Sequence, residues 1–293
     1  MSGRVILLAA GEMKRWQNYL NVPKHLVEIE GEPLLHRLIR QCHDSGVTDI
    51  RVATLHEGAL PGPAVLINVD TALKDHHAGK FLSTQASWSE EDRTFLIFGD
   101  TWLSTTGFKA IMTPVADGIC FVGRRGAGSY TGCPYGEIFG VSFAPSHHRR
   151  IAAAAQKIGS DEQVHRLAAG WALYHYLSSV LAADKSTDII FVDIDNFSED
   201  FDLPHDYDIW QEKAKALPYI ASPEYQNPVT LKRKQRRKNR VRRNNLLIIS
   251  ALVLFGFVIG QRMRIPDQPP THSDNMRPPI PEYQLISTSK FFI

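Results

Sequence analysis

The chain has 293 residues, of which 43% are hydrophobic and 22% charged, with a formal net charge of +2. This composition excludes a wholly disordered chain, and the length is enough for one sizeable core with an appendage. Three cysteines without paired spacing exclude a disulfide framework and indicate reduced thiols. Residues 1–231 hold 20 Lys and Arg against 28 Asp and Glu, whereas residues 232–243 hold nine cations and no acid. An acidic domain, a basic stretch and a weakly charged tail are therefore predicted.

The first predicted element is a buried parallel strand over Arg4–Leu8, because Val5 to Leu8 form an apolar run. The small residues Ala9, Ala10 and Gly11 follow, and they let the backbone approach a ligand closely. Lys14, Arg15 and Lys24 then supply three cations. A strand end, a small-residue loop and nearby cations are typical of a triphosphate cradle. The spacing fits neither G-x-G-x-x-G nor G-x-x-x-x-G-K-[ST].

This segment resembles the opening of the sugar-phosphate and molybdopterin-type nucleotidyltransferases (NTP transferases), whose pattern is L-A-A-G-x-G-x-R followed by P-K-x-L. Leu8-Ala9-Ala10-Gly11 and Arg15 match the first motif, and Pro23-Lys24-His25-Leu26 match the second. The resemblance implies that Arg15 and Lys24 are catalytic and that Leu8, Ala9, Ala10, Gly11 and Glu12 bind the nucleotide. Met13 departs from the pattern, because it replaces the second glycine. An ordinary strand and turn of an α/β protein is the alternative.

Strand-like and helix-like segments alternate along the rest of the acidic domain, which indicates a parallel α/β sheet. The resemblance covers residues 1–215 and implies a glycosyltransferase-A-like (Rossmann-like), mixed but mostly parallel sheet flanked by helices. Beyond the first strand, the predicted strands are Ile50–Thr54, Ala64–Asn68, Thr94–Phe98, Gly118–Val122, Glu137–Phe143 and Asp188–Val192. The predicted helices are Pro33–Asp44, Ala78–Ser87, Ser146–Lys157, Asp161–Ala182 and His205–Ala216.

Two apolar strands end in acidic residues, and carboxylates at the carboxyl edge of a sheet can hold a metal. Asp100 follows the strand Thr94–Phe98, and the resemblance implies that it binds Mg²⁺ against the nucleotide phosphates. Asp195 follows the last predicted strand and takes the place of the acid in the family's closing N-I-D-x-x-x-D-L segment. Asp193 is the alternative ligand. Five later acids are predicted to be solvated charges: Glu199, Asp200, Asp202, Asp206 and Asp208.

The glycine-rich segment Gly123–Glu137 is a candidate acceptor site. Arg124 and Arg125 lie beside glycines and could grip an acceptor phosphate. The resemblance implies that Gly136 and Glu137 contact the acceptor's hydroxyls. A surface loop without a role in binding is an equal alternative.

Leu246 to Gly260 form fifteen residues with one polar side chain, Ser250, and they are predicted to cross a membrane as a single helix. As a helix this segment is about 22 Å long, which is short for a hydrocarbon core of roughly 30 Å. A buried core helix is the alternative. Cations before the segment outnumber those after it, so the large domain is predicted to face the cytoplasm. The basic stretch lacks aromatic residues for base stacking, so anionic lipid rather than nucleic acid is its predicted partner.

The predicted organisation is a nucleotidyltransferase-like domain over residues 1–220, a linker with the basic stretch over 221–244, a membrane helix over 245–261 and a Pro-rich disordered tail over 262–293. The predicted function is Mg²⁺-dependent transfer of a nucleoside monophosphate from a nucleoside triphosphate to a phosphorylated acceptor, with release of pyrophosphate. A glycosyltransferase of the same fold, using Asp193-Ile194-Asp195 as a D-x-D motif, is one alternative. A catalytically idle nucleotide-binding adaptor at the membrane is another.

Overall fold

A computed structural model of the chain describes residues 3–11, 15–55, 60–73, 76–114, 117–125, 131, 136–161, 167–181, 189–194, 198–214 and 239. The chain divides into two compact units, Met1–Gln235 and Arg236–Ile293, and the fold below belongs to the first. Glu12, Met13, Asp195 and the predicted membrane segment Leu246–Gly260 lie outside the described residues. Within the described residues, none of the helices has both the length and the apolar character needed to cross a bilayer.

A seven-stranded sheet forms the centre of the first unit, in the order β10-β8-β9-β6-β1-β4-β5. Its strands are β1 (Arg4–Leu8), β4 (Asp49–Ala53), β5 (Val65–Ile67), β6 (Thr94–Phe98), β8 (Ile119–Arg124), β9 (Glu137–Phe143) and β10 (Ile189–Asp193). The pairs β1·β4, β1·β6, β4·β5 and β10·β8 are parallel, whereas β9 runs antiparallel to both β6 and β8. The prediction of a mixed, mostly parallel sheet is confirmed.

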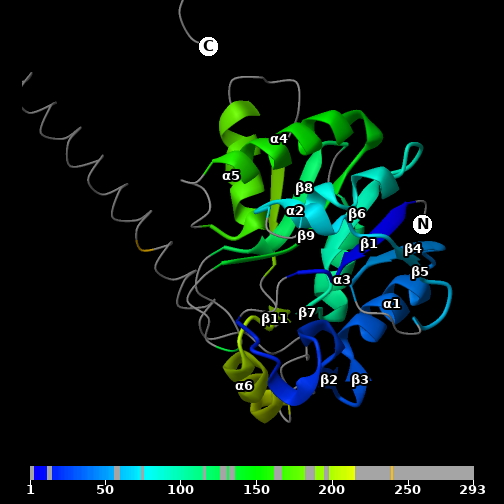
Figure 1. Cartoon of the computed structure of the whole chain (residues 1–293), viewed down its shortest axis with the longest axis vertical. Helices are drawn as coiled ribbons and strands as arrows, with labels where there is room; N and C mark the ends of the chain where they lie inside the picture. Colours follow the sequence, from blue (N-terminus) through cyan, green and yellow to red (C-terminus); the bar gives the residue numbers. More distant parts are fainter. Residues whose placement is uncertain are drawn as a thin grey trace, which may run out of the picture. The chain divides into compact units, whose positions relative to one another are not determined.

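Helices cover both faces of the sheet. This is needed because successive side chains of β1 point to opposite faces and all of them are apolar from Val5 to Leu8. Ile6 and Leu8 point into one apolar cluster, and Val5 and Leu7 into the other. The first cluster includes residues of α2 (Gly79–Leu82), α4 (His148–Ser160) and α5 (Ala169–Leu181). The second includes residues of α1 (Leu34–Asp44) and α3 (Thr105–Met112). Figure 1 shows α4 and α5 grouped together, apart from α1.

A third, aromatic cluster joins the segment after β1 to the end of the domain. Trp16, Trp102, Phe201 and Trp210 are its largest side chains, and all are buried. Trp210 belongs to α6 (Pro204–Ala214). This helix also contacts the short hairpin formed by β2 (Glu28–Ile29) and β3 (Glu32–Pro33), because one hydroxyl group and one side-chain amide of α6 donate to the carbonyl of Glu28. Figure 1 shows α6 beside this hairpin. This cluster packs together residues that lie almost two hundred positions apart in the sequence.

A second short pairing brings the end of the domain against the central sheet. The strand β11 (Glu199–Asp200) pairs antiparallel with β7 (Thr101–Trp102), so that Asp200 lies opposite Thr101. The amide of Phe201 also donates to the carbonyl of Asp100 at 3.3 Å. The acidic residues after β10 are thereby placed next to the carboxyl end of β6.

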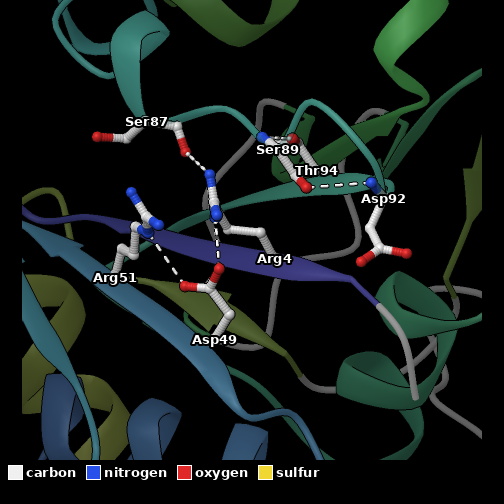
Figure 2. Close-up of polar contacts among 7 residues, drawn as sticks. All are labelled: Arg4, Asp49, Arg51, Ser87, Ser89, Asp92 and Thr94. Carbon is white, nitrogen blue, oxygen red and sulfur yellow. Dashed lines mark hydrogen bonds and ion pairs between the residues drawn. The ribbon is translucent and has the colours of Figure 1, made fainter.

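Polar contacts fix the opposite, amino-terminal end of the sheet (Figure 2). Arg4 donates from Nε to Asp49 at 2.6 Å and from Nη1 to the carbonyl of Ser87 at 2.9 Å. Arg51 donates to the same carboxylate at 3.0 Å. These contacts join β1, β4 and the segment before β6 away from the site. Their charges are therefore assigned to the fold and not to ligand binding.

Two predicted helices differ from the structure. The segment predicted as one helix over Ala78–Ser87 contains only the four-residue α2 and a separate 3₁₀ turn, Gln85–Ser87. The helix predicted from Asp161 begins at Ala169. The structure also contains α3, which was not predicted, because Thr105, Thr106 and Gly107 have low helix propensity. This helix begins where the Ser104 hydroxyl accepts a hydrogen bond from the amide of Gly107.

Candidate active site

Residues at the carboxyl ends of β1, β4, β5 and β6 and at the amino end of the antiparallel β9 line a cavity of about 630 Å³. Leu8, Ala9, Ala10 and Gly11 line it directly after β1. Leu8 pairs in register with Phe98, so the segments after β1 and β6 leave the sheet side by side. Ligands of α/β sheets bind at this edge. The size of the cavity suits a nucleotide-sized ligand.

Gly99 keeps these two segments close together. Its amide donates to the carbonyl of Leu8 at 2.9 Å. A Cβ atom at position 99 would lie 2.9 Å from the Cβ of Ala9 and 3.1 Å from the oxygen of Leu8. Only glycine fits this contact without a shift of the backbone. Asp100 is therefore held against the loop that follows β1.

Two cations and two acids of the cavity form one ionic network. Lys24, at the start of a 3₁₀ turn after the loop, forms ion pairs with Asp100 and, at 3.2 Å, with Asp202. Arg15 contacts the other oxygen of Asp202 at 2.6 Å. The Lys24 side chain is only 12% exposed, while Arg15 is 65% exposed. Three parts of the sequence thus meet within hydrogen-bonding distance, and all four side chains line the cavity.

The pKa values reflect this mutual compensation. Burial alone would lower the pKa of Lys24, but the charges of Asp100 and Asp202 outweigh burial and raise it above its ordinary value. Burial favours the neutral form of Asp100, yet Lys24 and Lys80 hold the pKa of this carboxyl below its ordinary value. Lys24 is therefore charged and Asp100 ionised at neutral pH.

Asp200 is the exception in the network. Burial, together with the carboxylates of Glu137, Asp202, Glu199 and Asp100, raises its pKa well above the ordinary value. Asp200 lines the same cavity as Asp100 and Asp202. Its surroundings in the cavity therefore favour the neutral form of this carboxyl.

The segment Ser198–Asp202 is held in place by a buried ion pair. Arg124 Nη2 contacts Glu199 Oε1 at 2.8 Å, and the two side chains are 4% and 0% exposed. Arg124 also donates to the carbonyl of Ser198 at 2.8 Å, and Glu199 accepts from the amide of Thr131 at 3.1 Å. Arg124 does not line the cavity. It supports the segment Ser198–Asp202 instead of taking the expected role in acceptor binding.

The expectation that Glu199, Asp200 and Asp202 are solvated charges is wrong. Glu199 is fully buried, and the two aspartates line the cavity. The missed signal is the spacing of Asp202 and Asp206, which matches D-x-x-x-D of the closing motif, with Tyr207 in place of leucine. Asp206 accepts from the amide of Leu203 at 2.8 Å at the start of α6. Asp202 is the acid of this motif that lines the cavity and pairs with Lys24, and the prediction for Asp195 stays a prediction.

The remaining predicted residues are placed as follows. Glu137 lines the cavity at the start of β9. Gly136 does not line it, but its carbonyl accepts from the indole of Trp171 at 2.7 Å, and Trp171 does. Asp193 is exposed, accepts from the amide of Arg125 at 3.0 Å and lies outside the cavity lining. Glu12 and Asp195 lie outside the described residues.

The structure adds Lys80 and Trp171 to the site, and the sequence carries no motif around either residue. Lys80 belongs to α2, and its ammonium lies 4.4 Å from the centre of the Phe98 ring. Trp171 belongs to α5, which lies more than seventy residues further along the chain. Both were missed because only the packing of helices against the sheet brings them to its carboxyl edge.

The acidic side of the cavity suits a divalent cation bound together with phosphates. Among the described residues no group of three or more His, Cys, Asp or Glu side chains is arranged as a metal site of its own. Magnesium commonly takes only one or two carboxylates and completes its shell with phosphate oxygens and water. Asp100 with Asp200 or Asp202, which line the same cavity, could supply these carboxylates.

The comparisons with known proteins come from structure alone, since no family model and no curated protein sequence matches the chain. The CTP:phosphocholine cytidylyltransferase LicC from Streptococcus pneumoniae is 16% identical, with a TM-score of 0.50 over 73% of this chain and 100% of LicC. Rv0371c from Mycobacterium tuberculosis H37Rv is also 16% identical, with a TM-score of 0.50 over 72% of this chain and 98% of that protein. At these identities the likeness establishes the fold alone: the chain shares the fold of LicC and of Rv0371c.

Proposed function

We propose that the protein is a Mg²⁺-dependent nucleotidyltransferase that moves a nucleoside monophosphate from a nucleoside triphosphate to a phosphorylated acceptor and releases pyrophosphate. The observation that carries this proposal is the position of Lys24. Its buried ammonium lies between Asp100 and Asp202, beside the loop of small residues that follows β1. Both reactants are polyanions, so a cation fixed at this point can serve the two phosphates that react.

The reaction needs alignment and charge neutralisation more than proton transfer. An oxygen of the acceptor phosphate attacks the α-phosphorus, and the bond from that phosphorus to the bridging oxygen of pyrophosphate breaks. The backbone of Ala9–Gly11 would cradle the triphosphate, and Arg15 would hold its outer oxygens. Lys24 would contact the attacking and the transferred phosphates. When the ligands bind, these cations exchange carboxylate partners for phosphate partners.

Asp100 and a second carboxylate, Asp200 or Asp202, would hold Mg²⁺, which supplies charge neutralisation at the α-phosphate. The carboxylates themselves keep Lys24 and Arg15 in position until the triphosphate arrives. The glycosyltransferase alternative is not favoured, because Asp193 of its D-x-D motif is exposed outside the cavity lining.

Pyrophosphate release by the purified full-length chain tests the proposal. The chain is incubated with each nucleoside triphosphate, Mg²⁺ and a panel of phosphorylated sugars and amino alcohols. We expect one combination to release pyrophosphate, and Lys24→Met and Asp100→Asn to lower the rate by about 10²-fold or more. Lys157→Met, on the exposed side of α4, is the control and should keep the wild-type rate. Release of a nucleoside diphosphate from a nucleotide sugar, without pyrophosphate chemistry, would contradict the proposal.

We also propose that the protein is tethered to a membrane by Leu246–Gly260, with the large domain in the cytoplasm. The support is the apolar sequence of this segment and the nine cations that precede it. The full-length chain should remain in the membrane fraction after carbonate extraction, and a chain ending at Leu231 should not. Release of the intact chain by carbonate would refute the tether.

A further inference from the structure

Lys80 differs from Arg15 and Lys24 in that no carboxylate of the described residues lies within ion-pair distance of its ammonium. Among the described residues, Lys24 pairs with Asp100 and Asp202 and Arg15 pairs with Asp202, whereas Lys80 forms no ion pair or hydrogen bond. The Lys80 ammonium instead makes a cation–π contact with the Phe98 ring, 4.4 Å from the ring centre. A lysine at the wall of a cavity that forms no direct ion pair is placed to receive an anion from a ligand.

The surroundings of Lys80 add to this argument. Burial lowers the pKa of Lys80 and the nearby charge of Lys24 lowers it further, while the more distant carboxylates of Asp100, Asp202 and Asp200 counteract these effects only in part. A bound anion would compensate both the lost solvation and the repulsion between the two ammonium groups. An anion beside Lys80 would therefore stabilise its charged form.

The position of Lys80 indicates which reactant supplies that anion. Arg15 and Lys24 stand on the segment that follows β1, where the triphosphate is expected. Phe98, below the Lys80 ammonium, instead faces the first turn of α5: a Cβ at Gly170 would lie 3.4 Å from its ring and 3.3 Å from the Cβ of Ile138. Ile138 and the neighbouring Glu137 belong to the half of the cavity where the acceptor is expected.

We propose that Lys80 binds the phosphate group of the acceptor, so that each of three cations in the cavity contacts a different part of the two reactants. This inference rests on the proposed nucleotidyl transfer. Arg15 holds the triphosphate, Lys24 contacts both reacting phosphates, and Lys80 holds the attacking phosphate from the side of α2. The acceptor class that follows is a phosphomonoester, whose two negative charges match Lys24 and Lys80 together.

Steady-state kinetics of the full-length chain test this assignment. Lys80→Met removes the charge and keeps the length of the side chain, and it should raise the KM for the acceptor by about tenfold or more while the KM for the triphosphate stays within about twofold. Lys80→Arg should recover much of the acceptor affinity, and the surface control Lys157→Met should change neither constant. A rise in the KM of the triphosphate alone, or no change in either constant, would overturn the assignment.

A second measurement separates this proposal from the proposed function, because it needs no turnover. The full-length chain is lightly acetylated with acetic anhydride in the presence and absence of inorganic phosphate, and the modified lysines are quantified by mass spectrometry. Phosphate should slow the acetylation of Lys80 and leave that of Lys157 unchanged. Protection without transferase activity would support phosphate binding by Lys80 and count against the proposed reaction. Acetylation of Lys80 that is insensitive to phosphate would refute its role.

Discussion

The buried pair of Arg124 and Glu199 allows a quantitative prediction about the support of the site. The two side chains are 4% and 0% exposed, with 2.8 Å between Nη2 and Oε1. Glu199→Gln removes one charge and leaves the guanidinium buried without a counter-charge, which costs about 3–5 kcal/mol. For a domain of this size each kcal/mol lowers Tm by about 2–4 °C, so the Tm should fall by roughly 6–20 °C.

Differential scanning calorimetry of the full-length chain measures this loss, and two further variants interpret it. The double variant Arg124→Leu with Glu199→Leu removes both charges and should regain most of the stability, because no unpaired charge remains. Glu32→Gln removes the partner of the exposed Arg40, 2.6 Å away, and should cost at most about 1 kcal/mol. A loss below about 1 kcal/mol for Glu199→Gln, or a double variant as unstable as the single one, would refute the reasoning.

Two other substitutions test the charge and the packing of the cavity. The pKa of Asp200 is raised in the folded state, so ionisation of Asp200 lowers the stability as the pH rises from the unfolded pKa to the folded pKa. Asp200→Asn cannot ionise and should therefore raise Tm at pH 7, but it should have no effect well below the unfolded pKa of about 4. Thermal melts at several pH values measure this difference. Equal Tm gains at all pH values would contradict this explanation. Gly99→Ala should lower stability by about 1–3 kcal/mol in urea unfolding, since its Cβ would press on Ala9 and Leu8, whereas Gly11→Ala, with open space at its Cβ, should not.

The strands of the central sheet were predictable from the sequence because each carries its own signal. The ranges predicted for β1, β6 and β9 coincide with the structure, and the other four differ by at most two residues at an end. Continuous apolar runs are needed wherever a strand is covered on both faces, whatever its neighbours are. The direction of β9 could not be predicted in this way, because the sequence of a strand does not show whether its partners run parallel or antiparallel to it. The pairing with β6 and β8 in the structure shows that β9 is antiparallel to both.

The first half of the site was also accessible from the sequence, because it lies within one continuous segment. Leu8–Gly11, Arg15 and Lys24 are spaced closely enough for a motif to indicate them, and the structure places all of them around one cavity. Asp100 could be added because it directly follows an apolar strand. In each case the functional side chain is next to the element that positions it.

The other half was decided by tertiary structure. Asp200 and Asp202 reach Asp100 because β11 pairs with β7 and because the buried Arg124 holds Glu199, contacts between residues about 75 to 100 positions apart. Lys80 enters the cavity through the packing of α2 on the sheet. The sequence by itself determined the strands, the first loop and its cations, since local hydrophobicity and spacing suffice for these. Which distant carboxylates and which lysine complete the site depends on pairing and packing free energies of the whole domain, which no local pattern encodes.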